Sequence, residues 1–364
     1  MKNNKTALYN KHIENGGNIV PFAGYLLPSH YTGINNEHNN VRKYAGLFDV
    51  SHMGEIIVSG DKAKEFLNQI STNNIYDLNL GQAQYSAICN DKGGIIDDLL
   101  IYREKQDFLL VVNASNKIDV LNWLNENSYK GVKIKDISDE TGLLAIQGPK
   151  SRDILSLILD EKVKTLQFYH FYQSKINGFN VLVSRTGYTG ELGFELFVKN
   201  IHLNDLWDIV IEKGRPHGLI PAGLGCRDTL RMEMKYCLHG NDININTNPI
   251  EAGLGWITKL GKRSFIGSKA CNDIKENIKR KLICFEMRER AIPRKDCLIF
   301  NKNKNVGVVT SGTMSPSLKK GIGIGYVEKK YSKINQKLYI DVRGKKKQAI
   351  IVKPPFYKNG SLND

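Results

Sequence analysis

Cysteine is scarce in this chain, and the few cysteines are scattered. Six occur in 364 residues, and no two of them form a Cys-x-x-Cys pair. Disulfide-stapled secreted domains and structural zinc sites both need closely spaced cysteines, so the pattern argues against both. Scattered single cysteines are typical of a reducing compartment, and we expect the protein to be cytoplasmic.

Long apolar runs are missing as well. No segment approaches the roughly 18 apolar residues of a membrane-spanning helix. The first residues, Met1–Lys5, lead into polar sequence without the apolar core of a signal peptide. The eight histidines show no metal-ligand spacing. We therefore expect no membrane association and no bound metal.

Several familiar site motifs fail on inspection. Residues 255–263 resemble a phosphate-binding loop, but the spacing is one residue too long and Arg263 stands where Ser or Thr is required. Asp49, Ser51 and His52 are the residue types of a catalytic triad. Three near neighbours on one segment cannot assemble its geometry, so we expect a packed or hydrogen-bonded role for His52.

Positive charge is concentrated in the last third. Residues 259–364 contain 26 basic and 8 acidic residues, a net charge of +18, while the whole chain has +15. A solvated surface explains this, and so does attraction for an acidic protein partner or a polyanionic ligand. Aromatic residues do not alternate with the basic ones as base stacking would need, so no nucleic-acid partner is predicted.

Helix and strand patterns mix over the first three quarters of the chain, which predicts an α+β fold. Ser115 is expected to cap a helix that carries Ile118, Leu121 and Leu124. From about residue 281 the pattern changes to short strands with Gly, Pro and Lys breaks, typical of a small β-barrel or sandwich. The length suits two or three domains. Three strands are expected before Ser115, at residues 84–90, 95–102 and 108–113.

Two adjacent acids stand out inside an apolar strand. Asp97 and Asp98 follow a predicted hairpin turn at residues 90–94. Side chains alternate along a strand, so the two acids should point in opposite directions, and at least one should meet apolar surroundings. A structural ion pair or a solvent-facing edge acid explains the pair. A carboxylate held in a cleft for proton transfer or cation stabilisation is the alternative.

Two glycine-rich segments are the other candidate site elements. Residues 184–195 place three glycines after a strand, which lets the backbone approach a ligand and brings in Tyr188 and Glu195. Residues 221–231 form a glycine turn that opens a helix with Arg227 in its first turn. A cation there is mildly unfavourable for the helix dipole and favours an anionic partner, although a local salt bridge with Asp228 or Glu233 explains it almost as well.

These residues match a known family when they are taken together. The chain resembles the tetrahydrofolate-dependent aminomethyltransferase of the glycine cleavage system, the T-protein, from about Thr6 to Tyr357. One motif alone would be weak, but eight in the same order are specific. They are Pro21–Tyr25, Gly46–Gly54, Gly93–Leu99, Arg185–Glu195, Gly223–Arg231, Tyr236–Asp242, Thr310–Leu318 and Lys353–Tyr357.

The resemblance implies a three-domain cloverleaf around a central folate channel. Its domains would be residues 1–50 with 138–275, residues 51–137, and a C-terminal β-barrel of residues 276–364. It also implies attack by N5 of tetrahydrofolate, as cosubstrate, on the aminomethyl group carried by the lipoyl arm of the H-protein within the glycine cleavage complex. Ammonia leaves and 5,10-methylenetetrahydrofolate forms.

Residue roles also follow from the resemblance. Asp97 matches the family's catalytic carboxylate, thought to favour N5 of the folate as nucleophile, and a fixed carboxylate would stabilise the iminium-like character of the transferred carbon. Glu195 matches the carboxylate that binds the 2-amino and N3 hydrogens of the pterin. Arg227 and Arg343 match substrate-contacting arginines. The remaining channel positions are Tyr85, Asn113, Tyr188 and Tyr236.

Small departures from the family pattern occur, such as His239 where members usually have Tyr. A folate-dependent demethylating relative is the nearest rival, but close relatives often replace the acid or carry a fused oxidase domain. A folate-binding accessory protein for RNA modification or iron–sulfur assembly would carry a Lys-Gly-Cys signature that this sequence lacks.

Overall fold

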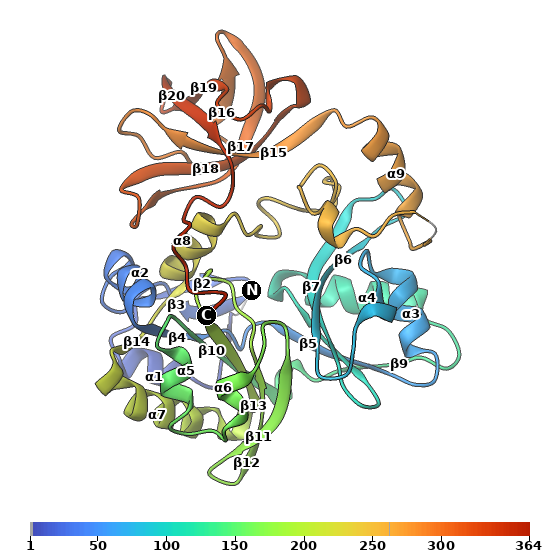
Figure 1. Cartoon of the computed structure of the whole chain (residues 1–364), viewed down its shortest axis with the longest axis vertical. Helices are drawn as coiled ribbons and strands as arrows, with labels where there is room; N and C mark the ends of the chain where they lie inside the picture. The colour runs from blue at the N-terminus through green and yellow to red at the C-terminus, as the bar shows by residue number, and fades with distance from the viewer. Residues whose placement is uncertain (1–2, 262) are drawn as a thin grey trace.

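The computed structural model describes residues 3–261 and 263–364, and three β-rich units are arranged around a centre (Figure 1). The first unit holds a six-stranded sheet of order β11-β12-β13-β10-β4-β14. The second holds a five-stranded sheet of order β6-β7-β8-β5-β9, and the third is a closed barrel of order β15-β18-β17-β16-β19-β20.

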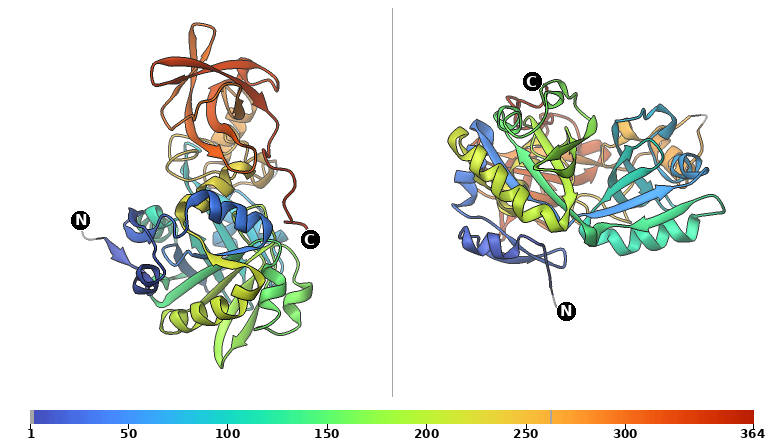
Figure 2. Two further views of the ribbon diagram at one scale, coloured as in Figure 1. Left: turned by 90° about the vertical axis from the view of Figure 1, so that its left-hand side faces the viewer. Right: turned by 90° about the horizontal axis from the view of Figure 1, so that it is seen from below.

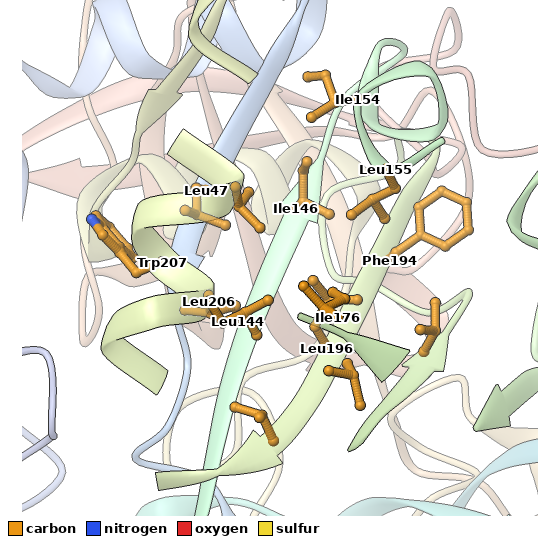
Figure 3. Packing of buried hydrophobic residues seen from close by; sticks show 14 of the residues in the cluster. Leu47, Leu144, Ile146, Ile154, Leu155, Ile176, Phe194, Leu196, Leu206 and Trp207 are labelled. Carbon is orange, nitrogen blue, oxygen red and sulfur yellow. The ribbon is translucent and has the colours of Figure 1, made fainter. Parts of the chain in front are cut away.

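The first unit buries its sheet against helices on one face. Apolar side chains of β4, β10 and β13, such as Leu47, Ile146 and Phe194, pack with Trp207 of α7 (Figure 3). Trp207 is 1% exposed, so this helix is fixed firmly to the sheet. The strands are β4 (Ala45–Asp49), β10 (Thr141–Gln147), β11 (Phe171–Ile176), β12 (Phe179–Ser184), β13 (Gly193–Lys199) and β14 (Leu219–Pro221).

Helices and a small sheet complete this unit. A three-stranded sheet of order β1-β3-β2 lies at the N-terminus, with β1 (Asn4–Lys5), β2 (Ile19–Phe22) and β3 (Tyr25–Pro28). The helices are α1 (Tyr9–Glu14), α2 (Ile34–Lys43), α5 (Ser151–Leu155), α6 (Lys162–Thr165), α7 (Leu203–Gly214) and α8 (Leu224–Met234).

The second unit has a two-faced sheet. One face packs on α3 (Ala63–Ile70) and α4 (Lys117–Asn127), and its core includes Ile56, Leu99 and Ile101. The other face, with Leu100 and Tyr102, packs toward the first unit. The strands are β5 (Gly54–Ser59), β6 (Ala83–Cys89), β7 (Ile95–Arg103), β8 (Phe108–Val112) and β9 (Lys133–Asp136).

The third unit is reached through α9 (Ser268–Glu276) and closes with a core of its own. Beyond the barrel the chain turns back to the first unit (Figure 2). There the Ser361 hydroxyl donates to Glu191 Oε2 at 2.6 Å. The barrel strands are β15 (Arg280–Met287), β16 (Leu298–Asn301), β17 (Lys304–Ser315), β18 (Lys320–Glu328), β19 (Lys337–Val342) and β20 (Lys345–Val352).

The predicted α+β class with a C-terminal β-barrel is confirmed. The proposed domain boundaries stay a prediction. One local prediction is wrong. Ser115 does not cap α4, because it lies in a short 3-10 turn at Ala114–Asn116 and the helix begins at Lys117 without a side-chain cap. No helix among residues 3–261 and 263–364 combines the length and apolar character needed to cross a membrane.

Candidate functional site

The two acids of β7 lie on opposite faces of the second sheet. Asp97 pairs across the strands with Ile88, on the face of the unit's own core, and its side chain is 0% exposed. Asp98 pairs with Ala87, on the face directed at the other units, and it is half-buried. Strand alternation therefore holds, and Asp98 is the acid that faces the space between the units.

Both carboxyl groups nevertheless share one amide. Asn113 Nδ2 donates to Asp97 Oδ1 at 2.8 Å and to Asp98 Oδ1 at 2.9 Å. Asn116 Nδ2 also donates to Asp97 Oδ1, at 2.7 Å, and the Tyr85 hydroxyl donates to Asp98 Oδ2 at 2.8 Å. Asn113 directly follows β8, so its side chain can reach both acids from the strand end. The result is a fixed pair of carboxyl groups.

Burial changes the protonation of this pair. Burial raises the pKa of Asp97 to about 8, and the neighbouring charge of Asp98 adds to the rise. Burial also raises the pKa of Asp98, against the hydrogen bond from Tyr85. Two adjacent carboxyl groups largely removed from water do not readily ionise together, and Asp97 keeps its proton near neutral pH.

The raised pKa of Asp97 predicts a pH-dependent stability. The folded state keeps a proton that the unfolded state has lost, so stability falls as pH rises from about 4 to about 8. Between pH 5 and pH 8, wild type should lose at least about 1 kcal/mol more unfolding free energy than Asp97→Asn. Urea unfolding at both pH values measures this. Parallel pH profiles for the two proteins would contradict the shift.

A second cluster comes from the first unit. Glu195 lies on β13 between Ala145 and Ser184, and its Oε2 accepts a short hydrogen bond from the Thr186 hydroxyl. Burial raises the pKa of Glu195, while Thr186 and Arg227 oppose the rise. Glu195 is therefore a half-buried carboxyl group that accepts one hydrogen bond, from Thr186, among the residues that the structure describes.

Arg227 supplies a cation to the same cluster. It lies in the first turn of α8, and its guanidinium carbon is 4.4 Å from the centre of the Tyr188 ring. Within the described parts of the chain, no carboxylate lies within ion-pair distance of Arg227. Burial lowers its pKa, and Tyr188 and Glu195 oppose that change. The alternative of a local salt bridge with Asp228 or Glu233 is not observed, because Asp228 pairs with Arg231 and Glu233 pairs with Arg42, each at 2.8 Å.

Aromatic rings line the space between the two clusters. Tyr188 stacks on Tyr236 with ring centres 5.6 Å apart, and Tyr85 lies 5.8 Å from Trp256. The charge of Asp98 acts on both Tyr85 and Tyr188, so the acid and these rings share one environment. Trp256 is 61% exposed, an unusual position for a tryptophan. Flat apolar walls beside acids and an unpaired arginine suit a planar, polar ligand.

The structure thus brings together six of the predicted residues, with Asp97 directly behind them and Arg343 apart. Asp97 lies on the core face of the second sheet and contacts the cluster through the side-chain amide and the backbone N–H of Asn113. Arg343 lies on the exposed turn between β19 and β20, and none of the described contacts joins it to the others. The role of Arg343 stays a prediction. The six are Tyr85, Asn113, Tyr188, Glu195, Arg227 and Tyr236.

Sequence reasoning missed Asn116 and Trp256. Asn116 Nδ2 donates to Asp97 and also lies 2.7 Å from His239 Nδ1. His239, the residue that departs from the family pattern, is thereby connected to the acid pair. Its signal was an asparagine three residues after Asn113. Trp256 follows a glycine in residues 253–258 and offered no periodic signal.

Metal-ligand groups and surface hollows were the other features that could mark a ligand site. Among residues 3–261 and 263–364, no group of three or more His, Cys, Asp or Glu side chains is arranged to hold a metal. Two surface hollows of about 470 and 660 Å³ lie at β11–β12 and beside α7, and share no residue with the clusters. The site is therefore defined by its side chains rather than by those hollows.

Comparison with known proteins gives the class. The GCVT N-terminal domain model matches residues 8–262, and the glycine cleavage T-protein C-terminal barrel domain model matches residues 280–358. Aminomethyltransferases from Halothermothrix orenii and Chloroherpeton thalassium are 48% and 46% identical, each over 97% of this chain and 99% of the relative. These matches define a transferase.

A solved structure agrees. The glycine cleavage system aminomethyltransferase T from Bartonella henselae superimposes with a TM-score of 0.91 at 32% identity, covering 98% of both chains. The chain belongs to the aminomethyltransferase family of the glycine cleavage system, the T-protein family. The resemblance noted from the sequence is confirmed.

Proposed function

We propose that this enzyme transfers the aminomethyl carbon from the lipoyl arm of an H-protein to tetrahydrofolate. Two new carbon–nitrogen bonds form at N5 and N10 of the folate, while the carbon–sulfur bond and the bond to the amine break. The two hydrogens lost from N5 and N10 end on the departing ammonia and on the lipoyl thiol. Ammonia, dihydrolipoyl H-protein and 5,10-methylenetetrahydrofolate are the products.

The acid pair is the observation that carries this proposal. The transferred carbon passes through iminium-like character, which one negative charge fixed in a buried site stabilises. Asp98 contributes that charge from the face between the units, and Asp97 positions it through the Asn113 amide that bonds both acids. The catalytic role that the resemblance gives to Asp97 is therefore proposed here for the pair, with Asp98 next to the ligand.

The second cluster is proposed to hold the folate. The pterin ring of the folate is planar and fits between aromatic side chains. The 2-amino and N3 hydrogens of that ring can donate to the carboxylate of Glu195, which otherwise accepts one hydrogen bond, from Thr186. Arg227, which has no carboxylate partner among the described residues, is proposed to bind an anionic or carbonyl oxygen of the ligand. Tetrahydrofolate is thus a cosubstrate, and the chemistry assigned here uses no metal.

The H-protein is proposed as a transient partner. The net charge of +18 over residues 259–364 would attract an acidic protein and speed its encounter with the enzyme. No nucleic-acid or membrane partner is part of the proposal.

One assay tests the function directly. Purified protein mixed with aminomethylated lipoyl H-protein and tetrahydrofolate should release ammonia, with one methylenetetrahydrofolate formed per ammonia. Omitting folate should reduce release by about 10²-fold or more, because the nucleophile is missing. A folate-dependent demethylase would instead consume an N-methylated amine and release no ammonia from the H-protein, and that result would replace the proposal.

A further inference from the structure

Glu55 is a buried carboxyl group whose oxygens are left without partners. It lies on β5, its residue is 0% exposed, and neither Oε1 nor Oε2 has a hydrogen-bond partner among the described residues. A carboxyl group in this state costs several kcal/mol (order of magnitude) even when it is neutral, because its hydrogen bonds to water are lost. A bound ligand or water could supply the hydrogen-bond partner that the described residues do not provide.

Its place on the sheet puts Glu55 on the ligand side. Glu55 pairs with Val111 across the strands, and Val111 pairs with Leu100, so all three share the face that carries Asp98. The neighbouring residues of β5, Gly54 and Ile56, alternate to the other face, where Ile56 enters the core of the second unit. Glu55 therefore extends the row of side chains that faces the first unit.

Glu55 also lies near the folate cluster. Glu195 is close enough for its charge to help burial raise the pKa of Glu55 well above the usual range. The nearest cation, Lys117, opposes that rise but lies 3.7 Å from carboxylate oxygens of both Asp136 and Asp139. Burial and the charge of Glu195 thus favour the protonated form of Glu55, which offers both an O–H donor and a carbonyl acceptor.

His52 is a second unsatisfied group in the same region. It is 2% exposed, its Nδ1 has no partner in the described chain, and its ring packs edge-on against Phe22 and Tyr25. Arg227 lies close enough to join burial in lowering the pKa of His52 to about 4, so the imidazole is neutral. The packed or hydrogen-bonded role expected for His52 from the sequence is borne out only in its packing.

We propose that Glu55 and His52 form a second polar contact of the folate site, which binds the carbonyl edge of the pterin ring directly or through an ordered water. This rests on the proposed function. Glu195 takes the 2-amino and N3 hydrogens, and the adjacent C4 carbonyl then needs a donor. Glu55 and His52 can each donate a hydrogen bond in their neutral forms. They would therefore complete the carbonyl edge without adding charge to a cluster that already holds Arg227 and Glu195.

Substitutions at Glu55 separate this role from a structural one. Glu55→Leu removes the donor and should weaken tetrahydrofolate binding about tenfold or more, while the melting temperature stays the same or rises because an unsatisfied polar group is gone. Glu55→Gln retains an N–H donor and should bind within about threefold of wild type. Calorimetry with tetrahydrofolate and a thermal melt give both quantities.

Two further variants guard the test. His52→Phe keeps the ring packing on Phe22 and Tyr25 but loses the ring nitrogens, and it should also weaken tetrahydrofolate binding about tenfold. This variant tests the proposal even if Glu55→Leu does not fold. Glu65→Leu is the matched control, since this carboxylate of α3 is exposed and paired with Lys62, and its variant should bind as wild type does.

The outcomes are distinct. Normal folate affinity in Glu55→Leu and His52→Phe overturns the inference, and a lowered melting temperature with unchanged affinity identifies Glu55 as a structural partner of Lys117. In both cases the proposed function stands if wild type binds tetrahydrofolate and releases ammonia. Failure of wild type to bind tetrahydrofolate overturns both the inference and the proposed function.

Discussion

Replacing Asp98 by Asn is expected to lower turnover by about 10²–10³-fold, which is the usual loss when one fixed stabilising group is removed from an active site. The amide keeps the shape, but its single oxygen can accept from only one of Tyr85 and Asn113, which both donate to the carboxylate. Loss of the other hydrogen bond should lower stability by about 1 kcal/mol and leave folate affinity nearly unchanged. Single-turnover ammonia release under saturating folate and aminomethylated H-protein measures the chemical step without contributions from binding.

Asp97→Asn is the matched comparison for this experiment. It sits one residue away and shares the Asn113 amide, but its side chain is fully buried on the core face. We expect a loss of at most about tenfold, because the positioning of Asp98 changes while its charge remains. If Asp97→Asn were the more damaging variant, Asp97 would be the catalytic acid, as the resemblance alone implies.

The strand patterns of the sequence predicted the frame of the site well. The strand expected at residues 95–102 is observed at Ile95–Arg103, and the change to short strands near residue 281 coincides with the start of the barrel at Arg280. Such elements are predictable because apolar alternation and glycine turns act over a few residues. Alternation also correctly required the two acids of β7 to face opposite sides.

The choice between the two acids lay beyond the sequence. Alternation says that Asp97 and Asp98 differ, but only the pairing of β7 with β6 and the helices packed on one face decide which side is the core. The helix start at Lys117 was missed for a similar reason. Asn113 and Asn116 bond the acid pair, and Ser115 lies in the turn between them instead of capping the helix.

Residues that act across units left no local signal. Trp256 contacts Tyr85 from a 3-10 helix at Gly255–Ile257, far away in the sequence. Glu55 lies in a strand, where a lone acid is usually interpreted as solvent-facing. Arg343 shows the converse, since a family match gave it a role while the turn between β19 and β20 leaves it exposed. Contacts between units depend on long-range packing, which periodicity in one segment does not encode.

Asp242→Asn is expected to cost about 3–5 kcal/mol of unfolding free energy, because it removes the buried carboxylate partner of a buried guanidinium and leaves only the half-exposed Asp228. Asp242 is 0% exposed and Arg231 is 2% exposed, and Arg231 Nη1 donates to Asp242 Oδ2 at 2.7 Å. The same carboxylate accepts from the Thr310 hydroxyl of β17. It therefore ties α8 of the first unit to the barrel.

The loss should extend to the site. Arg231 Nη1 also donates to the Tyr236 carbonyl at 3.1 Å, and Tyr236 stacks on Tyr188, so loosening Arg231 should weaken folate binding together with stability. Asp228→Asn is the matched control, because Asp228 pairs with the same arginine at 2.8 Å but its side chain is 49% exposed, and surface pairs contribute only about 0–1 kcal/mol. Urea unfolding of both variants measures the difference. Equal losses of unfolding free energy for Asp228→Asn and Asp242→Asn would show that the buried pair does not hold the units together. Partial recovery of that free energy in the double variant Arg231→Met with Asp242→Leu would confirm that the cost comes from the unpaired charge.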